Sequence, residues 1–328
     1  MGRNRIWIPE AFSPVTESII HLPPVRLGGY YTVDLVESKT GKVKQHLEFP
    51  NLITNAGLDL IGSGVNLNGV YSLLAVGTGN STPAVTDTAL DNELTPSVNN
   101  GGISDVDTTQ SSPREYSSRK RTRVFTEAQA NGDLTELGWR VGSTLCNRAL
   151  FADLQGNPTI VYKTSNDILK ITYEYRIFAP QGDMSGAFDL GVGSGSTSYI
   201  IRPQNVNNAL GWGSLRSNLG SLSSSLARIH STAILGSRTG DNSPTPYSGS
   251  TSHSYGGYVS GNYYRDMEYI WTFSGGDFIP VGGVRLITWN PWYASGDSPT
   301  WQMYLSASLA KTSLTKFTIK FRHTWNRV

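Results

Sequence analysis

Two glycines separated by one residue, Gly77 and Gly79, precede Thr82 and Pro83 in the stretch AVGTGNSTPAVTDTAL. A glycine-containing turn between a strand and a helix can hold a phosphate, because backbone N–H groups and the helix dipole both favour an anion. The other parts of such a site are missing. No Lys-Ser or Lys-Thr pair follows, Thr82 stands where a dinucleotide site needs its third glycine, and AVTDTAL is a poor helix. We therefore expect Gly77 and Gly79 to end a core strand in a sharp turn, where glycine tolerates a positive φ.

The residue types that supply nucleophiles, general acids or metal ligands show no catalytic spacing. No serine has a glycine two residues away on both sides, and the five histidines are dispersed, without a zinc-binding pattern. Carboxylates such as Asp133 and Glu136, or Asp266 and Glu268, are expected near turns or on exposed strand faces. We therefore expect no catalytic residue, no metal and no cofactor. The enzymatic alternative, a polysaccharide depolymerase, would need two carboxylates that converge in a groove.

A basic cluster, Arg119, Lys120, Arg121 and Arg123, lies in the stretch REYSSRKRTRVF. It could bind phosphates or an acidic polysaccharide. In a strand, however, the three arginines point to one side and Lys120 to the other. Such a stripe is more typical of a solvated strand face or of a contact with another subunit, and we assign the cluster as a candidate subunit or partner contact.

Aromatic residues in Gly- and Asn-rich segments form a second candidate contact. Tyrosine and tryptophan in such loops can stack on sugar rings or anchor a protein partner. Tyr269 and Trp271 alternate and are expected in the core. The candidates for glycan or partner contact are Tyr255, Tyr258, Tyr263, Tyr264, Trp292 and Tyr293.

The composition points to β structure and gives no support for several partners. Only 16% of the 328 residues are charged, against about 25% in typical soluble domains, while Gly, Ser, Thr, Asn and aromatic residues are plentiful. The net charge of +2 gives no argument for nucleic acid or membrane binding. No segment has the ~20 apolar residues of a membrane span, and the first residues lack the apolar core of a signal peptide. The single cysteine, Cys146, allows no disulfide within the chain, and we expect a protein that folds in a reducing cytoplasm.

Four prolines among the first residues favour an extended arm over residues 1–29. Such an arm either clasps a neighbouring subunit or lies along its own domain. Residues 30–328 are expected to form one domain, with a Gly/Ser/Tyr-rich insertion at about 181–276.

Patterns within this domain predict individual elements. Residues 32–49 form a β-hairpin around Lys39-Thr40-Gly41-Lys42, and Thr54 caps one short helix that ends at Gly62 to Gly64. Alternation of apolar and polar residues predicts strands over 168–177 and 317–325. Many strands and almost no helix indicate an all-β protein, an antiparallel β-sandwich of jelly-roll type with long surface loops.

Several segments resemble a family of tailed-bacteriophage virion proteins described as tail-fibre, collar or baseplate components. They are TGKVKQHLEFPNLITNAGLDLI, LLAVGTGNSTPAVTDTAL, ELGW with LCNRALFADLQGNPTIVYKTSNDILKITYEYRIF, and LAKTSLTKFTIKFRHTWNRV. The matching motifs are Phe49-Pro50-Asn51, Gly156-Asn157-Pro158, Tyr173 to Ile177 and Trp325-Asn326-Arg327. The resembling regions are mainly residues 40–95, 134–180 and 305–328.

The resemblance implies a structural protein of the virion, assembled in the bacterial host cytoplasm. Such a protein would form a homo-oligomer in the tail, collar or baseplate and connect other virion proteins or fibres. The alternatives are a receptor- or glycan-binding module of a tail fibre, which would attach to a host surface glycan, and a capsid-surface decoration protein.

Overall fold

Strands dominate the computed structural model, which describes residues 19–64, 73–97, 116–189, 195–204, 206, 227–231, 233–238, 248–249, 252–271, 283–291, 300–309 and 317–328. Within these ranges the single helix is α1 (Asn55–Gly62). The all-β class is therefore confirmed, and the jelly-roll connectivity stays a prediction. No helix in these ranges has the length and apolar character needed to span a bilayer.

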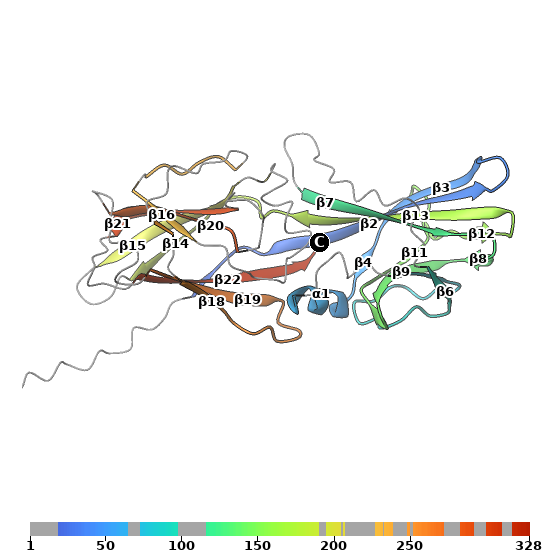
Figure 1. The fold of residues 1–328 in the computed structure, drawn as a ribbon, viewed down its shortest axis with the longest axis horizontal. Helices are drawn as coiled ribbons and strands as arrows, with labels where there is room; N and C mark the ends of the chain where they lie inside the picture. Colours follow the sequence, from blue (N-terminus) through green and yellow to red (C-terminus); the bar gives the residue numbers. More distant parts are fainter. Residues whose placement is uncertain are drawn as a thin grey trace, which may run out of the picture.

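One sheet runs along most of the elongated molecule (Figure 1). Its strands follow the order β18-β19-β22-β2-β13-β7, with β1 beside β22 and β3 beside β2. Their bounds are β1 (Ile19–His21), β2 (Val25–Glu37), β3 (Val43–Pro50), β7 (Tyr116–Phe125), β13 (Asp167–Phe178), β18 (Ser252–Tyr255), β19 (Tyr264–Trp271) and β22 (Phe317–Arg327). β2 and β22 run parallel and pair through Val25–Leu27 and Trp325–Arg327, near the middle of the molecule.

A second sheet packs against β2 and β13 and forms with them the first half of the molecule. Its strands are β4 (Leu52–Ile53), β5 (Leu73–Gly77), β6 (Glu93–Ser97), β9 (Glu136–Val141), β10 (Thr144–Leu145) and β11 (Asn147–Leu150). The short pair β8 (Gly132–Leu134) and β12 (Val161–Lys163) lies at the outer end of this half. Buried aromatic rings join the two layers, since Tyr173 lies 5.0 Å from Tyr31 and 6.0 Å from Trp139 between ring centroids.

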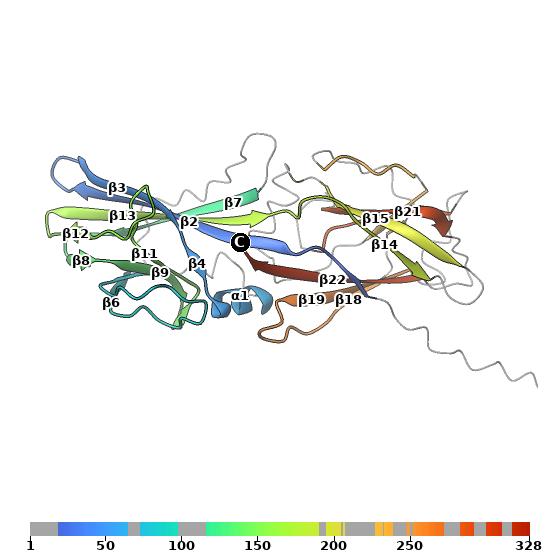
Figure 2. The ribbon, with the colours of Figure 1, turned by 180° about the vertical axis from the view of Figure 1, so that it is seen from behind.

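A third sheet packs against β19 and β22 in the second half, which Figure 2 shows from behind. Its strands are β14 (Met184–Asp189), β15 (Ser196–Pro203), β16 (Arg228–His230), β17 (Ser248–Gly249), β20 (Val284–Trp289) and β21 (Trp301–Leu309). The Trp289 ring stacks on Phe321 at 4.2 Å, and Trp301 meets the ring of His323 edge-on at 6.4 Å. Tyr269 and Trp271 are fully buried, as expected.

The clearest sequence patterns are confirmed. The β2–β3 hairpin turns at Gly41, whose φ is 73°. The hydroxyl of Thr54 accepts a hydrogen bond of 3.0 Å from the Gly57 N–H at the start of α1, as an N-cap should. The alternating apolar residues of β13 and of β22 point into the core.

Residues 19–29 of the expected arm lie along their own domain, which is the second of the two alternatives, but they are packed strands and not an unpacked arm. Ile20, Leu22, Val25 and Leu27 are buried within their own chain, because β1 and the start of β2 run beside β22. Prolines 23 and 24 are tolerated between two strand segments, where a missing N–H breaks no ladder. Residues 1–18 lie outside the described residues.

The segment expected as a Gly/Ser/Tyr-rich insertion also has a larger part in the fold than expected. Residues 181–276 supply the strands β14 to β19, so the segment expected as an insertion builds much of the second half, and the buried residues of both halves join in one core. Its periodicity is weak because a few large side chains among Gly, Ser and Asn carry its core contacts.

Candidate functional site

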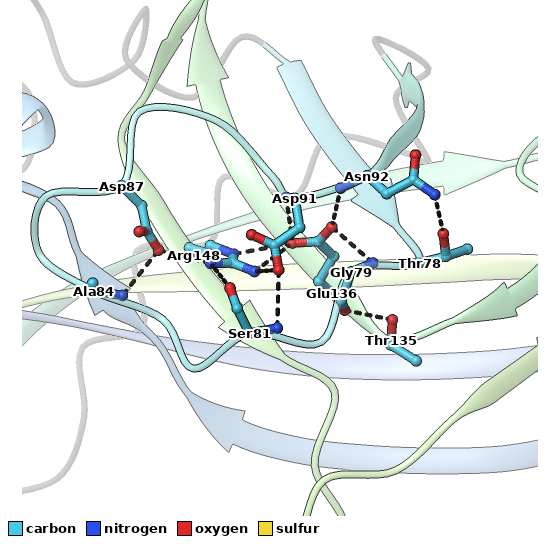
Figure 3. A network of polar contacts seen from close by, with 10 residues as sticks. All are labelled: Thr78, Gly79, Ser81, Ala84, Asp87, Asp91, Asn92, Thr135, Glu136 and Arg148. Carbon is cyan, nitrogen blue, oxygen red and sulfur yellow. Dashed lines mark hydrogen bonds and ion pairs between the residues drawn. The ribbon is translucent and has the colours of Figure 1, made fainter.

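The loop between β5 and β6 wraps around one buried carboxylate, that of Glu136 on β9 (Figure 3). Glu136 Oε1 accepts hydrogen bonds from the backbone N–H groups of Gly79 (3.0 Å) and Asn92 (2.9 Å). Its Oε2 accepts from the N–H of Asp91 (3.1 Å). The glycine-containing loop therefore cradles an anion, and this anion is the chain's own glutamate.

Arg148, on the neighbouring strand β11, completes this arrangement. Its side chain is 1% exposed and donates from Nε to Glu136 Oε2 at 3.0 Å. It also pairs with Asp87 (2.8 Å) and Asp91 (2.7 Å) and donates to the hydroxyl of Ser81 (3.1 Å). We call Ser81, Asp87, Asp91, Glu136 and Arg148 the Glu136–Arg148 centre.

The chemistry of this centre is structural. Glu136 is fully buried, and the loop and Arg148 occupy both of its oxygens, so it is closed to a substrate. Hydrogen bonds from Ser81 lower the pKa of Asp91, which keeps that carboxylate ionised and unsuited to act as a general acid. The centre fixes a loop of about fifteen residues to β9 and β11. Within the described ranges, no group of three His, Cys, Asp or Glu residues is arranged to hold a metal ion.

Two expectations for this site were wrong, the exposure of Glu136 and the positive φ of Gly77 and Gly79. Glu136 is buried and not on an exposed strand face, because Arg148 and the loop N–H groups replace its water. Neither Gly77 nor Gly79 has a positive φ. Glycine is required there by close approach, since a Cβ on Gly79 would lie 2.3 Å from Glu136 Oε1.

We expect Gly79→Ala to lower the free energy of unfolding by about 1–3 kcal/mol, because the methyl group forces the loop away from Glu136. Gly257→Ala is the matched control, since a Cβ there meets open space and its φ is not in the left-handed region. It should change stability by less than about 0.5 kcal/mol in the same urea titration. Equal effects would contradict this account of Gly79.

The basic cluster lies on β7, at the edge of the long sheet. Its arginines share one side as expected, but this side faces the core, since Arg123 stands in register with the buried Ile171. Arg123 is 5% exposed, and its guanidinium lies 5.2 Å above the ring of Trp139. The prediction that Arg123 contacts a partner is thus wrong, because its guanidinium stacks on the ring of Trp139 inside the fold. Lys120 lies on the other face, 4.0 Å from Glu174.

Arg119 and Arg121 are partly exposed. For these two arginines and for Lys120, a subunit contact stays a prediction.

The predicted aromatic contacts divide into three groups. Tyr255 is 50% exposed beneath Arg265, and the partly exposed ring of Tyr264 packs against Arg322 at 3.8 Å, so both stay candidates for a surface contact. Trp292 and Tyr293 lie outside the described residues. Tyr258 and Tyr263 belong to the loop between β18 and β19.

The prediction that Tyr258 contacts a glycan is wrong, because its hydroxyl and its ring make contacts within the chain. Its hydroxyl donates a 2.5 Å hydrogen bond to Asp59 Oδ1 on α1, and its ring lies 5.7 Å from that of Trp325. Tyr263 is partly buried in the same loop, with a φ of 50°, and Arg327 is hydrogen-bonded to it. The partners of Tyr258 are remote in sequence, so residue type and spacing could not reveal them.

Asp59 connects the two halves of the molecule. Besides Tyr258, it accepts hydrogen bonds from the Ser260 hydroxyl (2.8 Å) and from the Gly261 N–H (2.7 Å). Burial alone would raise the pKa of Asp59, but these hydrogen bonds outweigh it and lower the pKa. From β22, the indole of Trp325 donates to the carbonyl oxygen of Leu58 at 3.3 Å. We call Asp59 with its three donors the Asp59 junction.

We expect Asp59→Ala to lower the free energy of unfolding by about 1–3 kcal/mol, since a phenol, a hydroxyl and an amide lose their acceptor together. Amide hydrogen exchange at Gly261 should accelerate, which places the loss at the junction. Tyr258→Phe, which removes one of the three bonds, is the graded control and should cost less. Unchanged exchange at Gly261 in Asp59→Ala would contradict the role of this carboxylate.

Comparison with known proteins identified no relative. The sequence matches no protein-family model, no curated protein and no solved structure.

Proposed function

We propose that the chain is a structural protein of a tailed-phage virion, present in several copies in the tail, collar or baseplate, where it connects other virion proteins or fibres. The observation that carries this proposal is where the resembling segments lie. They contribute β3, α1, the loop of the Glu136–Arg148 centre, β9, β11, β13 and β22, and β2 joins β3, β13 and β22 in one sheet. These elements form one framework from the outer end of the first half to the middle of the second.

The geometry of this framework suits a connector. A protein that links neighbours must keep its two ends in a fixed relation, and here a continuous sheet passes through both halves. The Asp59 junction holds α1 of the first half to the loop of the second half. The buried charges of the Glu136–Arg148 centre are likewise used to hold the scaffold.

Mass spectrometry of virions purified from the phage that carries this sequence tests the proposal. We expect the chain in the particle in several copies, and in a particle reconstruction as contacts with other virion proteins. Absence of the chain from purified particles would overturn the proposal.

A glycan-binding module of a tail fibre is the second candidate, favoured by the half-exposed ring of Tyr255 on β18 and the partly exposed ring of Tyr264 on β19. Exposed aromatic rings can stack on sugars. Replacement of both tyrosines by alanine should then reduce adsorption of the purified protein to host cells, and unchanged adsorption would count against this candidate.

A further inference from the structure

An open apolar hollow of about 340 Å³ lies in the first half, where the chain leaves β3 and enters β4. Three prolines contribute to its wall: Pro50 from β3, Pro83 from the loop of the Glu136–Arg148 centre, and Pro158 from the turn after β11. Leu52, Leu150 and Ala152 add further apolar surface. Three segments that the sequence singled out therefore meet at one place. Arg148 of the Glu136–Arg148 centre also lines the hollow, with its charge paired to carboxylates, and the Asp59 junction has no residue there.

The wall of the hollow next to Pro158 is preformed. Asp153 Oδ1 accepts hydrogen bonds from the N–H groups of Gln155 (2.9 Å) and Asn157 (2.8 Å), which fix the turn. Leu154, on this turn, is 65% exposed. The volume and the mostly apolar lining of the hollow are those of a site that can take apolar side chains.

The chain itself contains a segment of matching chemistry. Eighteen residues precede Ile19, and they include the apolar run Ile6-Trp7-Ile8-Pro9. Fully extended at about 3.3 Å per residue, this segment reaches roughly 60 Å. Burial of a tryptophan and two isoleucines is strongly favourable, and proline brings no N–H that an apolar site would leave unsatisfied.

The direction of β1 bears on whether this segment binds in the hollow of its own chain or in the hollow of a neighbouring copy. β1 runs parallel to β22 toward the first half, so Ile19 marks the end of β1 that is farther from that half. The hollow lies in the first half, at Asn51, whose N–H donates to the carbonyl oxygen of Gly29. To fill its own hollow the segment would have to reverse beside β1. A neighbouring copy requires no reversal.

We propose that residues 6–9 of one copy bind in the apolar hollow of a neighbouring copy. The inference rests on the proposed multi-copy assembly and names a second copy of this chain as the partner of the hollow.

Mixtures of singly substituted full-length chains test this exchange. One chain carries Glu10→Cys, next to the apolar run, and is labelled with ¹⁵N. The other carries Gln155→Cys, on the exposed turn beside Leu154. The native Cys146 is 2% exposed, and burial raises the pKa of its thiol to about 12, so it contributes little background. Lys39→Cys, exposed at the tip of the β2–β3 hairpin, is the matched control for Gln155→Cys.

Under mild oxidation we expect a disulfide between labelled and unlabelled chains, seen as a species of twice the chain mass and identified by its mixed-isotope peptide. Its yield should exceed that with Lys39→Cys several-fold and should be lost when Trp7→Ala is added to the Glu10→Cys chain. Equal yields with both acceptors, no mixed disulfide, or closure only within a doubly substituted Glu10→Cys/Gln155→Cys chain would overturn the proposal. If the chain is present in virions but forms no such disulfide, only the exchange fails and the structural role stands.

Discussion

Glu136→Gln should lower the free energy of unfolding by about 3–5 kcal/mol, because it leaves a buried guanidinium without its buried counter-charge. The Gln amide group would also face donors, since Arg148 Nε and the Asp91 N–H both point at Glu136 Oε2. Urea unfolding followed by fluorescence measures the loss, and hydrogen exchange should show the amides of Gly79 and Asn92 opening first.

Glu93→Gln is the matched control for this substitution. Glu93 on β6 also pairs with an arginine, Arg140 on β9, but both side chains are more than a fifth exposed. An ion pair in contact with water contributes about 0–1 kcal/mol, so Glu93→Gln should be nearly neutral. Similar losses in the two variants would mean that the Glu136–Arg148 centre is not the element that holds the loop.

The strands that could be predicted are those in which apolar and polar residues alternate along the strand itself. In β13, the residues from Leu169 to Ile177 alternate between the core and the outer face, and the same holds for β22 from Ile319 to Trp325. The start of α1 could also be predicted from neighbouring residues, because the Thr54 hydroxyl accepts a hydrogen bond from the N–H of Gly57, three residues later. Such patterns need no knowledge of the remaining chain.

The polar centre depends on contacts that no local pattern contains. Arg148 is expected at a surface by its type, yet it is buried by carboxylates that come from a loop some sixty residues away. Arg123 is similar, because only the register of β7 against β13 turns its side toward the core. The resemblance marked the segments that hold Glu136 and Arg148 without indicating that the two residues meet.

Acid should destabilise the protein at a pH well above the range in which carboxylates titrate, and His323 is the reason. This histidine is 3% exposed on the core face of β22, beside Trp301. Burial lowers its pKa from 6.5 to about 3, although the charge of Asp266 acts in the opposite direction. Between these two values the unfolded chain binds a proton that the folded chain does not. Stability is therefore complete above about pH 6.5 and falls as the pH decreases, by about 1.4 kcal/mol for each unit.

The window from pH 6.5 to 5 isolates this effect, because carboxylates stay ionised there in both states. We expect the free energy of unfolding to fall across the window in the wild type and to be nearly level in His323→Gln, whatever the absolute stability of that variant. His46 is the opposing control, since a hydrogen bond to Asp34 raises its pKa on the exposed strand β3. Its small contribution is complete below about pH 6.5 and is lost as the pH rises through the raised pKa, so His46→Gln should leave the slope between pH 6.5 and 5 nearly unchanged. An unchanged slope in His323→Gln would assign the acid sensitivity to another group and would mean that water reaches the face of β22 that packs against the third sheet.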